Sequence, residues 1–173
     1  TLEASKTIPI SVGISEPLLV RANSRFAILP ASKTPTFAFL TNNVNQVKVS
    51  VYKVNPEDYK KFNDVHYDYE GWHSKLEEYG ELKGFVASSS KVLAIPKAVD
   101  QFRETQIDLL PYLNDGIGNA IVTVEKWPRV KDNVQRFAVW LEATKIGIDA
   151  FSDERSAVVF ATNLKDGTPL AGA

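Results

Sequence analysis

Cysteine and methionine are absent from the 173 residues of this chain, and only two histidines are present. Without cysteine there can be no disulfide, no thiolate metal site and no cysteine nucleophile. The absence is compatible with an oxidising bacterial envelope, where unpaired thiols are a liability, although many cytosolic proteins also have few cysteines. Because there is no initiating methionine, we expect a processed chain or an excised fragment.

An excess of charge of one sign and long apolar runs are also missing. The formal net charge is -1 at pH 7, so the composition has no electrostatic signature of nucleic-acid or anionic-membrane binding. No run approaches the roughly 18 apolar residues of a membrane-spanning helix, and the N-terminus has no basic region followed by an apolar one. We therefore expect no nucleic acid as partner and no membrane span in this chain.

Short β-rich apolar runs punctuated by turn residues make up most of the sequence. Hydrophobic residues amount to 44%, enough to build a sizeable core. No helix-strand alternation of the βαβ kind is present, so the pattern predicts an all-β sandwich. Strands are expected at 25–29, 36–41, 47–54, 101–107, 119–126, 137–141, 145–151 and 157–161, and residues 84–95 are expected to form a hairpin that turns at Ser88, Ser89 and Ser90.

One helical decoration is predicted after the strand at 47–54. The Asn-Pro-Glu-Asp sequence at 55–58 has an N-cap residue, a proline for the first helical position and acids for the first turn. We expect a short helix over residues 56–62. Residues 63–83 interleave charged and aromatic side chains and are interpreted as a helical insertion that lies on the sandwich.

The insertion contains two sets of candidate functional residues. The first comprises both histidines and three acids, which could bind a divalent cation: His66, His73, Asp64, Asp68 and Glu70. The calcium-loop pattern is not satisfied, so a solvated loop is the favoured interpretation and no metal site is predicted. The second comprises four aromatics that form a possible interaction surface for a sugar or a protein, or that fasten the insertion to the sandwich: Tyr67, Tyr69, Trp72 and Tyr79.

Catalytic patterns are not found elsewhere. Asp108 lies in an apolar run, and its favoured interpretation is helix capping. Ser88, Ser89 and Ser90 have no evident base, and no helix is expected directly after the glycines at 116 and 118 to cradle a phosphate. The sequence predicts no catalytic residue, no cofactor and no enzyme activity; a metal-assisted hydrolase centred on the two histidines is the weakest hypothesis.

Three stretches together resemble the bacterial α2-macroglobulin family. Residues 47–59 are similar to a family strand that ends in Tyr-Lys-Val-x-Pro-x-Asp-Tyr, and residues 107–125 to its Ile-Asp-Leu turn and following strand. The third stretch matches the family's strand-and-hairpin pattern at Thr144, Ile146, Gly147, Ile148, Thr162, Leu164, Gly167, Pro169, Leu170, Gly172 and Ala173.

This resemblance implies a fold and a domain division. The fold would be a macroglobulin-like antiparallel β-sandwich of fibronectin or immunoglobulin-like architecture, from the N-terminal half of a longer protein. Residues 1–21 would be a linker or the last strand of a preceding domain. Residues 22–143 would form the sandwich, and residues 144–173 the truncated start of the following macroglobulin-like domain.

The resemblance also implies a function. It indicates a non-catalytic structural module of a protease inhibitor of the trap type, located in the bacterial cell envelope (periplasmic or a membrane-anchored lipoprotein) or secreted. Its partners would be the neighbouring macroglobulin-like domains of the same chain and, through the full-length protein, target proteases. The family's Cys-x-x-Gln thioester cannot lie in this cysteine-free segment. The alternative is a surface adhesin or carbohydrate-binding sandwich that uses the aromatic insertion at residues 63–83.

Overall fold

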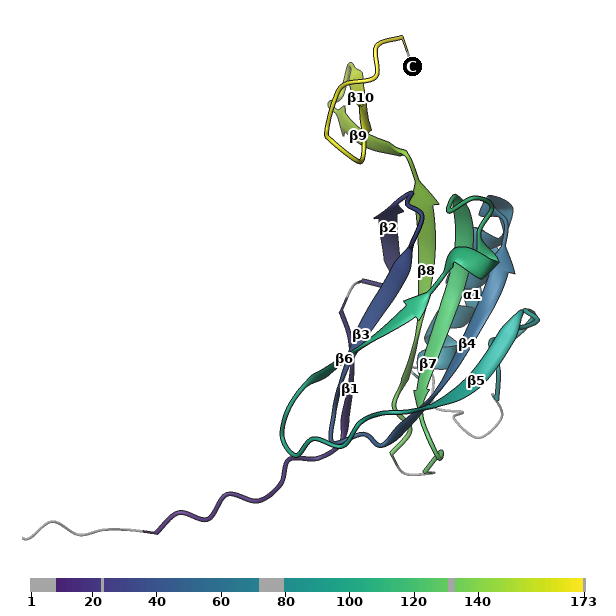
Figure 1. The fold of residues 1–173 in the computed structure, drawn as a ribbon. Coiled ribbons are helices and arrows are strands. Elements are labelled where there is room, and N and C mark those ends of the chain that lie inside the picture. Colours follow the sequence, from purple (N-terminus) through teal and green to yellow (C-terminus); the bar gives the residue numbers. More distant parts are fainter. Residues whose placement is uncertain (1–8, 23, 72–79, 131–132, 173) are drawn as a thin grey trace, which may run out of the picture.

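The computed structural model describes residues 9–22, 24–71, 80–130 and 133–172. Two β-sheets pack face to face, one helix covers the outer face of the larger sheet, and a two-stranded hairpin projects from one end (Figure 1). In this part of the chain no helix is long and apolar enough to cross a membrane.

The two sheets contain eight strands. The larger sheet has the order β2 (Phe26–Pro30), β8 (Arg136–Thr144), β7 (Gly118–Lys126), β4 (Gln46–Val54) and β5 (Ser89–Ala94). The smaller sheet has the order β1 (Leu18–Arg21), β3 (Thr36–Asn42) and β6 (Arg103–Asp108). The predicted fold class, an all-β sandwich with a small helical part, is confirmed, and every pair in these sheets is antiparallel except β2 with β8, which is parallel.

Two predictions about strands need correction. Residues 84–95 do not form a hairpin, because β5 runs as one strand along β4 and places Ser90 opposite Ser50. The two serine hydroxyls lie 2.9 Å apart and satisfy each other, so Ser89 and Ser90 are accommodated within the strand and Ser88 directly precedes it. Residues 18–21, grouped above with the preceding linker, pair with β3 and are therefore a strand of the sandwich.

The helix is longer than expected. A 3₁₀ turn, η1 (Pro56–Asp58), leads into α1 (Tyr59–Glu70), which ends at Gly71 with φ of 85°. The predicted end at residue 62 is wrong, since the first part of the supposed insertion continues the same helix. Phe62, His66 and Tyr69 form a buried stripe at helical spacing, which holds the whole helix on the sheet although charged residues surround it.

Apolar side chains fill both interfaces of the larger sheet. Between the two sheets lie Phe37 and Phe39 of β3, with aliphatic residues of β4, β7 and β8. On the opposite face Trp140 packs beneath the helix, its ring centroid 5.7 Å from that of Phe62 and 5.2 Å from that of Tyr59. The sandwich is therefore three layers deep on the side that carries α1.

Glu70, the last residue of α1, links the helix to both sheets. Its Oε1 accepts a hydrogen bond of 3.1 Å from the backbone N–H of Ala138 in β8 and one of 2.7 Å from Nη1 of Arg21 in β1. β2 begins at Phe26, which stands opposite Trp140 of β8. The N–H of Ala138 therefore lies beyond the end of β2, and Glu70 accepts its hydrogen bond there.

A tight turn joins η2 (Leu110–Tyr112) to β7 and packs against the β2–β3 loop. Gly116 has φ of 76°, and a Cβ at this position would lie 2.2 Å from the backbone oxygen of Ser32. Gly118 has φ of 130°, but its Cβ would make only an ordinary contact, 3.8 Å from Leu113.

The first prediction concerns these two glycines. Gly116→Ala should lower the free energy of unfolding by about 2–4 kcal/mol, because backbone strain and a clash with a peptide group combine. Gly118→Ala is the matched control and should cost about 1–2 kcal/mol from strain alone. Urea denaturation of both variants measures the difference. Equal losses would show that the approach to Ser32 is not close in solution.

Candidate interdomain interface

The four aromatic residues predicted as an interaction surface do not form one surface. Tyr67 is 41% exposed on α1 and lies under the guanidinium group of Arg25, whose Nη1 also donates to the tyrosine hydroxyl. Tyr69 is 4% exposed and fastens the helix to the sheet, with Arg136 Cζ 4.5 Å from its ring centroid. Trp72 and Tyr79 lie outside the described residues.

Those residues weighed as metal ligands that the structure describes form no ligand cluster. His66 is buried; its Nδ1 lies 2.9 Å from the carbonyl oxygen of Asn63 and its Nε2 lies 3.1 Å from Nη1 of Arg25. These contacts fit a neutral ring with its proton on Nδ1, so both nitrogens are used within the fold. His73 lies outside the described residues, and within them no group of three or more potential ligands could hold a metal ion.

Asp108 binds a backbone group of the turn that it was predicted to cap, although the N-cap residue of that turn is Leu109. Its Oδ1 accepts a hydrogen bond of 2.9 Å from the backbone N–H of Leu110, at the start of η2. The carboxylate is thus a capping group in a turn.

A buried polar cluster that the sequence did not indicate lies beneath the end of α1. Glu125 of β7 is 2% exposed, and its two carboxylate oxygens accept bonds of 2.5 and 2.9 Å from Nε and Nη2 of Arg129. Burial raises the pKa of the neighbouring Tyr69 hydroxyl, and the Glu125 carboxylate adds to the rise. Burial also raises the pKa of Tyr52. The cluster is a structural network, because its acid and its cation are already paired.

Alkaline titration tests this cluster. In the unfolded chain tyrosine ionises with its ordinary pKa of 10.0, whereas Tyr69 in the folded chain ionises at a higher pH. The unfolded state therefore binds fewer protons above pH 10, and stability that is fully present below that pH is lost as the pH rises. Each such tyrosine contributes a slope of up to about 1.4 kcal/mol per pH unit. The free energy of unfolding, measured from pH 9 to 12, should fall less steeply with pH in Tyr69→Phe than in the native chain. An unchanged slope would contradict the raised pKa.

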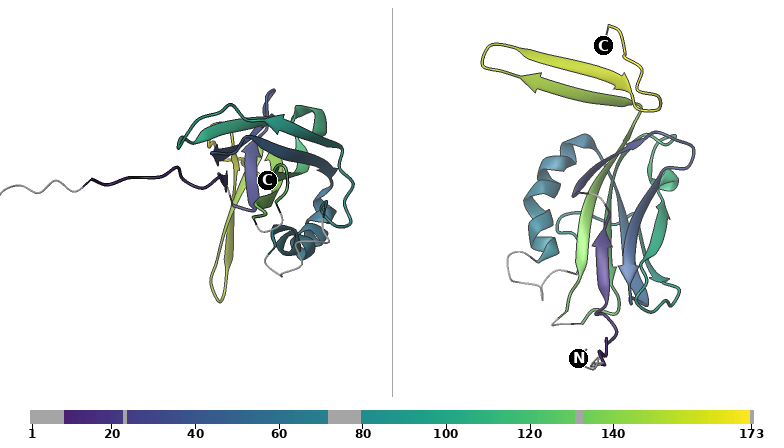
Figure 2. Two further views of the ribbon diagram at one scale, coloured as in Figure 1. Left: turned by 90° about the horizontal axis from the view of Figure 1, so that it is seen from below. Right: turned by 90° about the vertical axis from the view of Figure 1, so that its left-hand side faces the viewer.

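The projecting hairpin is the largest departure from a closed sandwich. β9 (Ile146–Ser152) and β10 (Ala157–Asn163) pair antiparallel and extend away from the end of β8 (Figure 2). The joint is short: Ala31 donates its N–H to the carbonyl of Thr144 at 2.8 Å, and Leu164 donates to that of Lys145 at 2.9 Å. One strand therefore passes directly from the sandwich into the hairpin.

Both faces of this hairpin are apolar and exposed. On one face Phe151 and Phe160 are 64% and 55% exposed, and their ring centroids lie 6.2 Å apart. On the other face Ile148 and Val159 are 67% and 61% exposed. A half-buried antiparallel strand normally has one wet face, and apolar patches of this kind mark contact surfaces. The hairpin therefore has the composition of strands that are covered on both sides.

A third extended segment begins beside β10. After the turn, Pro169 is bridged to Thr162, Thr168 accepts a bond of 2.8 Å from the N–H of Asn163, and Leu170 donates one of 2.9 Å to Ala161. The chain therefore turns back at residues 165–168 and runs alongside β10. Residues 168–170 thus run beside β10 and extend the hairpin by a short third segment.

Solved structures with this arrangement are fragments of native α2-macroglobulin from Escherichia coli. The fragment that spans domains NIE-MG1 has a TM-score of 0.63 and 18% identity, over 92% of this chain and 75% of that one. This chain has the fold of bacterial α2-macroglobulin domains. The longer fragment, which spans MG0-NIE-MG1, has a TM-score of 0.56 and 18% identity, over 90% of this chain and 48% of that one.

The predicted resemblance to bacterial α2-macroglobulin is therefore confirmed by the fold. No protein-family model matches the sequence, and no relative is found among curated proteins. The chain thus shares the α2-macroglobulin fold at low sequence identity.

The exposed hairpin leads to a third prediction. Phe160→Ser together with Phe151→Ser should strongly reduce the fluorescence of a dye that binds apolar surfaces, because the largest side chains of one face are removed. The unfolding midpoint of the sandwich should stay the same, since both residues lie outside its core. Glu154→Gln, in the turn of the same hairpin, is the control and should change neither quantity. A fall in the unfolding midpoint would show that the hairpin packs on the sandwich in solution.

Proposed function

We propose that this chain is a non-catalytic structural module of a bacterial α2-macroglobulin-like protease inhibitor, in which it holds neighbouring domains. The observation that carries the proposal is the hairpin, which leaves the sandwich through one short joint and has two uncovered apolar faces. The similar fragments from E. coli, whose printed descriptions name consecutive domains, support it.

In this proposal the domain boundaries follow those expected from the sequence, with β1 added to the sandwich. Residues 9–17 lead in from a preceding domain. Residues 18–143 form a rigid macroglobulin-like body, and residues 144–172 begin the following domain, whose remaining strands cover at least one face of the hairpin. The proposed partners are these adjoining domains and, through the full-length inhibitor, target proteases, in the bacterial envelope or outside the cell.

The joint at Thr144 and Lys145 explains how such a module acts. A close-packed sandwich transmits a displacement without deforming, and two discrete arrangements of whole domains are easier to achieve at their interfaces. The module therefore fixes the angle between the bodies on either side of it, and cleavage elsewhere in the protein changes the whole shape through such joints.

The alternative, a carbohydrate-binding surface on residues 63–83, has less support. Tyr69 is buried, which leaves Tyr67 as the exposed aromatic among the described residues of that proposed surface. Its ring is already covered by Arg25.

The fourth prediction is made for the full-length parent protein. Phe151→Ser with Phe160→Ser should weaken the packing of the following domain and reduce inhibition of an added protease, measured as cleavage of a large protein substrate. Glu154→Gln should leave inhibition unchanged. Full inhibition by the double variant, together with a normal unfolding profile of the following domain, would contradict the role proposed for the hairpin.

A further inference from the structure

An open sheet edge lies on the sandwich, apart from the hairpin. Among the strands of the described residues, β5 pairs only with β4. Ile95 donates its backbone N–H to the carbonyl of Asn45 at 2.8 Å, and alternate residues of an antiparallel strand turn their backbone groups to the partner. The backbone N–H and C=O groups of the odd-numbered residues of β5 therefore bond to β4. Those of Val92 and Ala94 point in the opposite direction, towards the open edge of the sheet.

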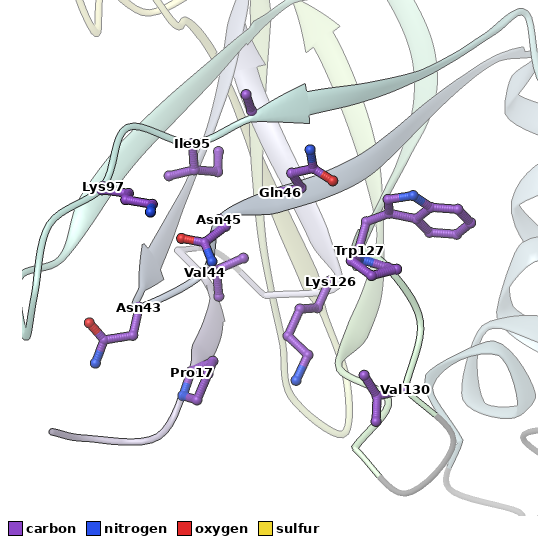
Figure 3. Close-up of a pocket in the computed structure, with 12 residues that line it drawn as sticks. Pro17, Asn43, Val44, Asn45, Gln46, Ile95, Lys97, Lys126, Trp127 and Val130 are labelled. Atoms are coloured by element: carbon purple, nitrogen blue, oxygen red, sulfur yellow. The ribbon is translucent and has the colours of Figure 1, made fainter.

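Two hollows adjoin this edge. A cavity of about 270 Å³ lies between the edge strands β5 and β6 and is lined by Leu93, Ile107 and Tyr112 among others. A groove of about 580 Å³ continues around the end of β5, with Ile95 and Trp127 in its wall (Figure 3). An extended chain laid along β5 would turn every second side chain towards the inner side of the sheet, where the cavity lies.

The side chains around the hollows carry positive charge. Lys91 lines the cavity, and Lys97 and Lys126 line the groove, whose lining contains no aspartate or glutamate. None of these three lysines takes part in a salt bridge within the described part of the chain. Asp108 also lines the cavity, where its carboxylate offsets the charge of Lys91, so the excess of positive charge comes from Lys97 and Lys126 at the groove. The edge is therefore complementary to an anionic strand.

We propose that the β5 edge binds an extended peptide segment of another protein that alternates acidic and apolar side chains, and that this segment adds to the larger sheet as a strand. Its backbone pairs with Val92 and Ala94, and its acidic side chains lie on the inner side of the sheet with Lys91. Its apolar side chains then lie on the outer side, beside those of Val92 and Ala94. The site lies outside the hairpin and does not depend on the function proposed for it.

Lys91 makes the edge selective. It stands opposite Val49, whose side chain is in the core, so Lys91 is directed to the inner side of the sheet at its open margin. A lysine in this position opposes the addition of a neutral strand. An acidic residue brought beside it removes that obstacle.

The experiment uses three blocked synthetic peptides and the intact chain. One alternates valine with glutamate, the second valine with glutamine and the third valine with lysine, and binding is measured by calorimetry. The glutamate peptide should bind, the glutamine peptide about tenfold more weakly, as expected from two or three exposed ion pairs, and the lysine peptide not at all. Amide exchange at Val92 and Ala94 should slow when the glutamate peptide is bound. Equal binding of the glutamate and glutamine peptides, or binding of neither, would overturn the proposal.

Two variants separate backbone pairing from charge. Val92→Pro removes an outward N–H and spares the ladder to β4, so it should abolish binding while the unfolding profile is kept. Lys91→Glu with Lys97→Glu should reverse the preference towards the lysine peptide. Lys165→Glu, in the turn after the hairpin, is a charge-reversal control outside the site and should bind as the native chain does. Unchanged preference in the double lysine variant would refute the proposal even if the proline variant failed to fold. Binding of a sugar in place of peptides would likewise refute it.

Discussion

Burial of the larger sheet on both of its faces is the constraint on which the rest of this structure depends. The central strands β7 and β8 have almost unbroken runs of buried residues, so neither face can be left to water. The smaller sheet covers one face through Phe37 and Phe39, and α1 covers the other by placing Phe62 over Trp140. Full burial of side chains of this size contributes about 2–3 kcal/mol each, which is why the helix is held along its whole length.

The same constraint identifies what the hairpin needs. Its strands have the two-faced apolar character of β7 and β8, but no sheet or helix of the described residues covers either face. A protein that covers Ile121 on one side of a sheet and Val122 on the other would gain little from exposing Ile148 and Phe151, unless these residues also meet partners. The two-sided burial of the sandwich is thus the reason for proposing that further strands cover the hairpin.

The sequence predicted the strands well where periodicity and turn residues agreed, as at residues 47–54 and 119–126. It failed where tertiary contacts decide the outcome. The serines at 88–90 resemble a turn, and the accommodation of Ser89 and Ser90 in a strand becomes evident only when Ser50 is placed opposite Ser90. The length of α1 was missed because its buried stripe includes a histidine and a tyrosine among charged neighbours. The candidate surface could not be judged from sequence for the same reason: Tyr67 and Tyr69 are two positions apart, so they occupy different sides of one helix.

The partial coverage of the larger sheet also explains its open margin. α1 and the smaller sheet cover the β8 and β7 region, whereas β5 lies at the margin of the larger sheet (Figure 1). A hollow remains between β5 and β6. An edge of this kind is a risk for aggregation, which inward-directed charge such as Lys91 reduces. The same charge makes the edge unsuitable for neutral strands and favourable for acidic ones. Lys91, which reduces aggregation through the open edge, therefore also determines which kind of strand could pair with β5.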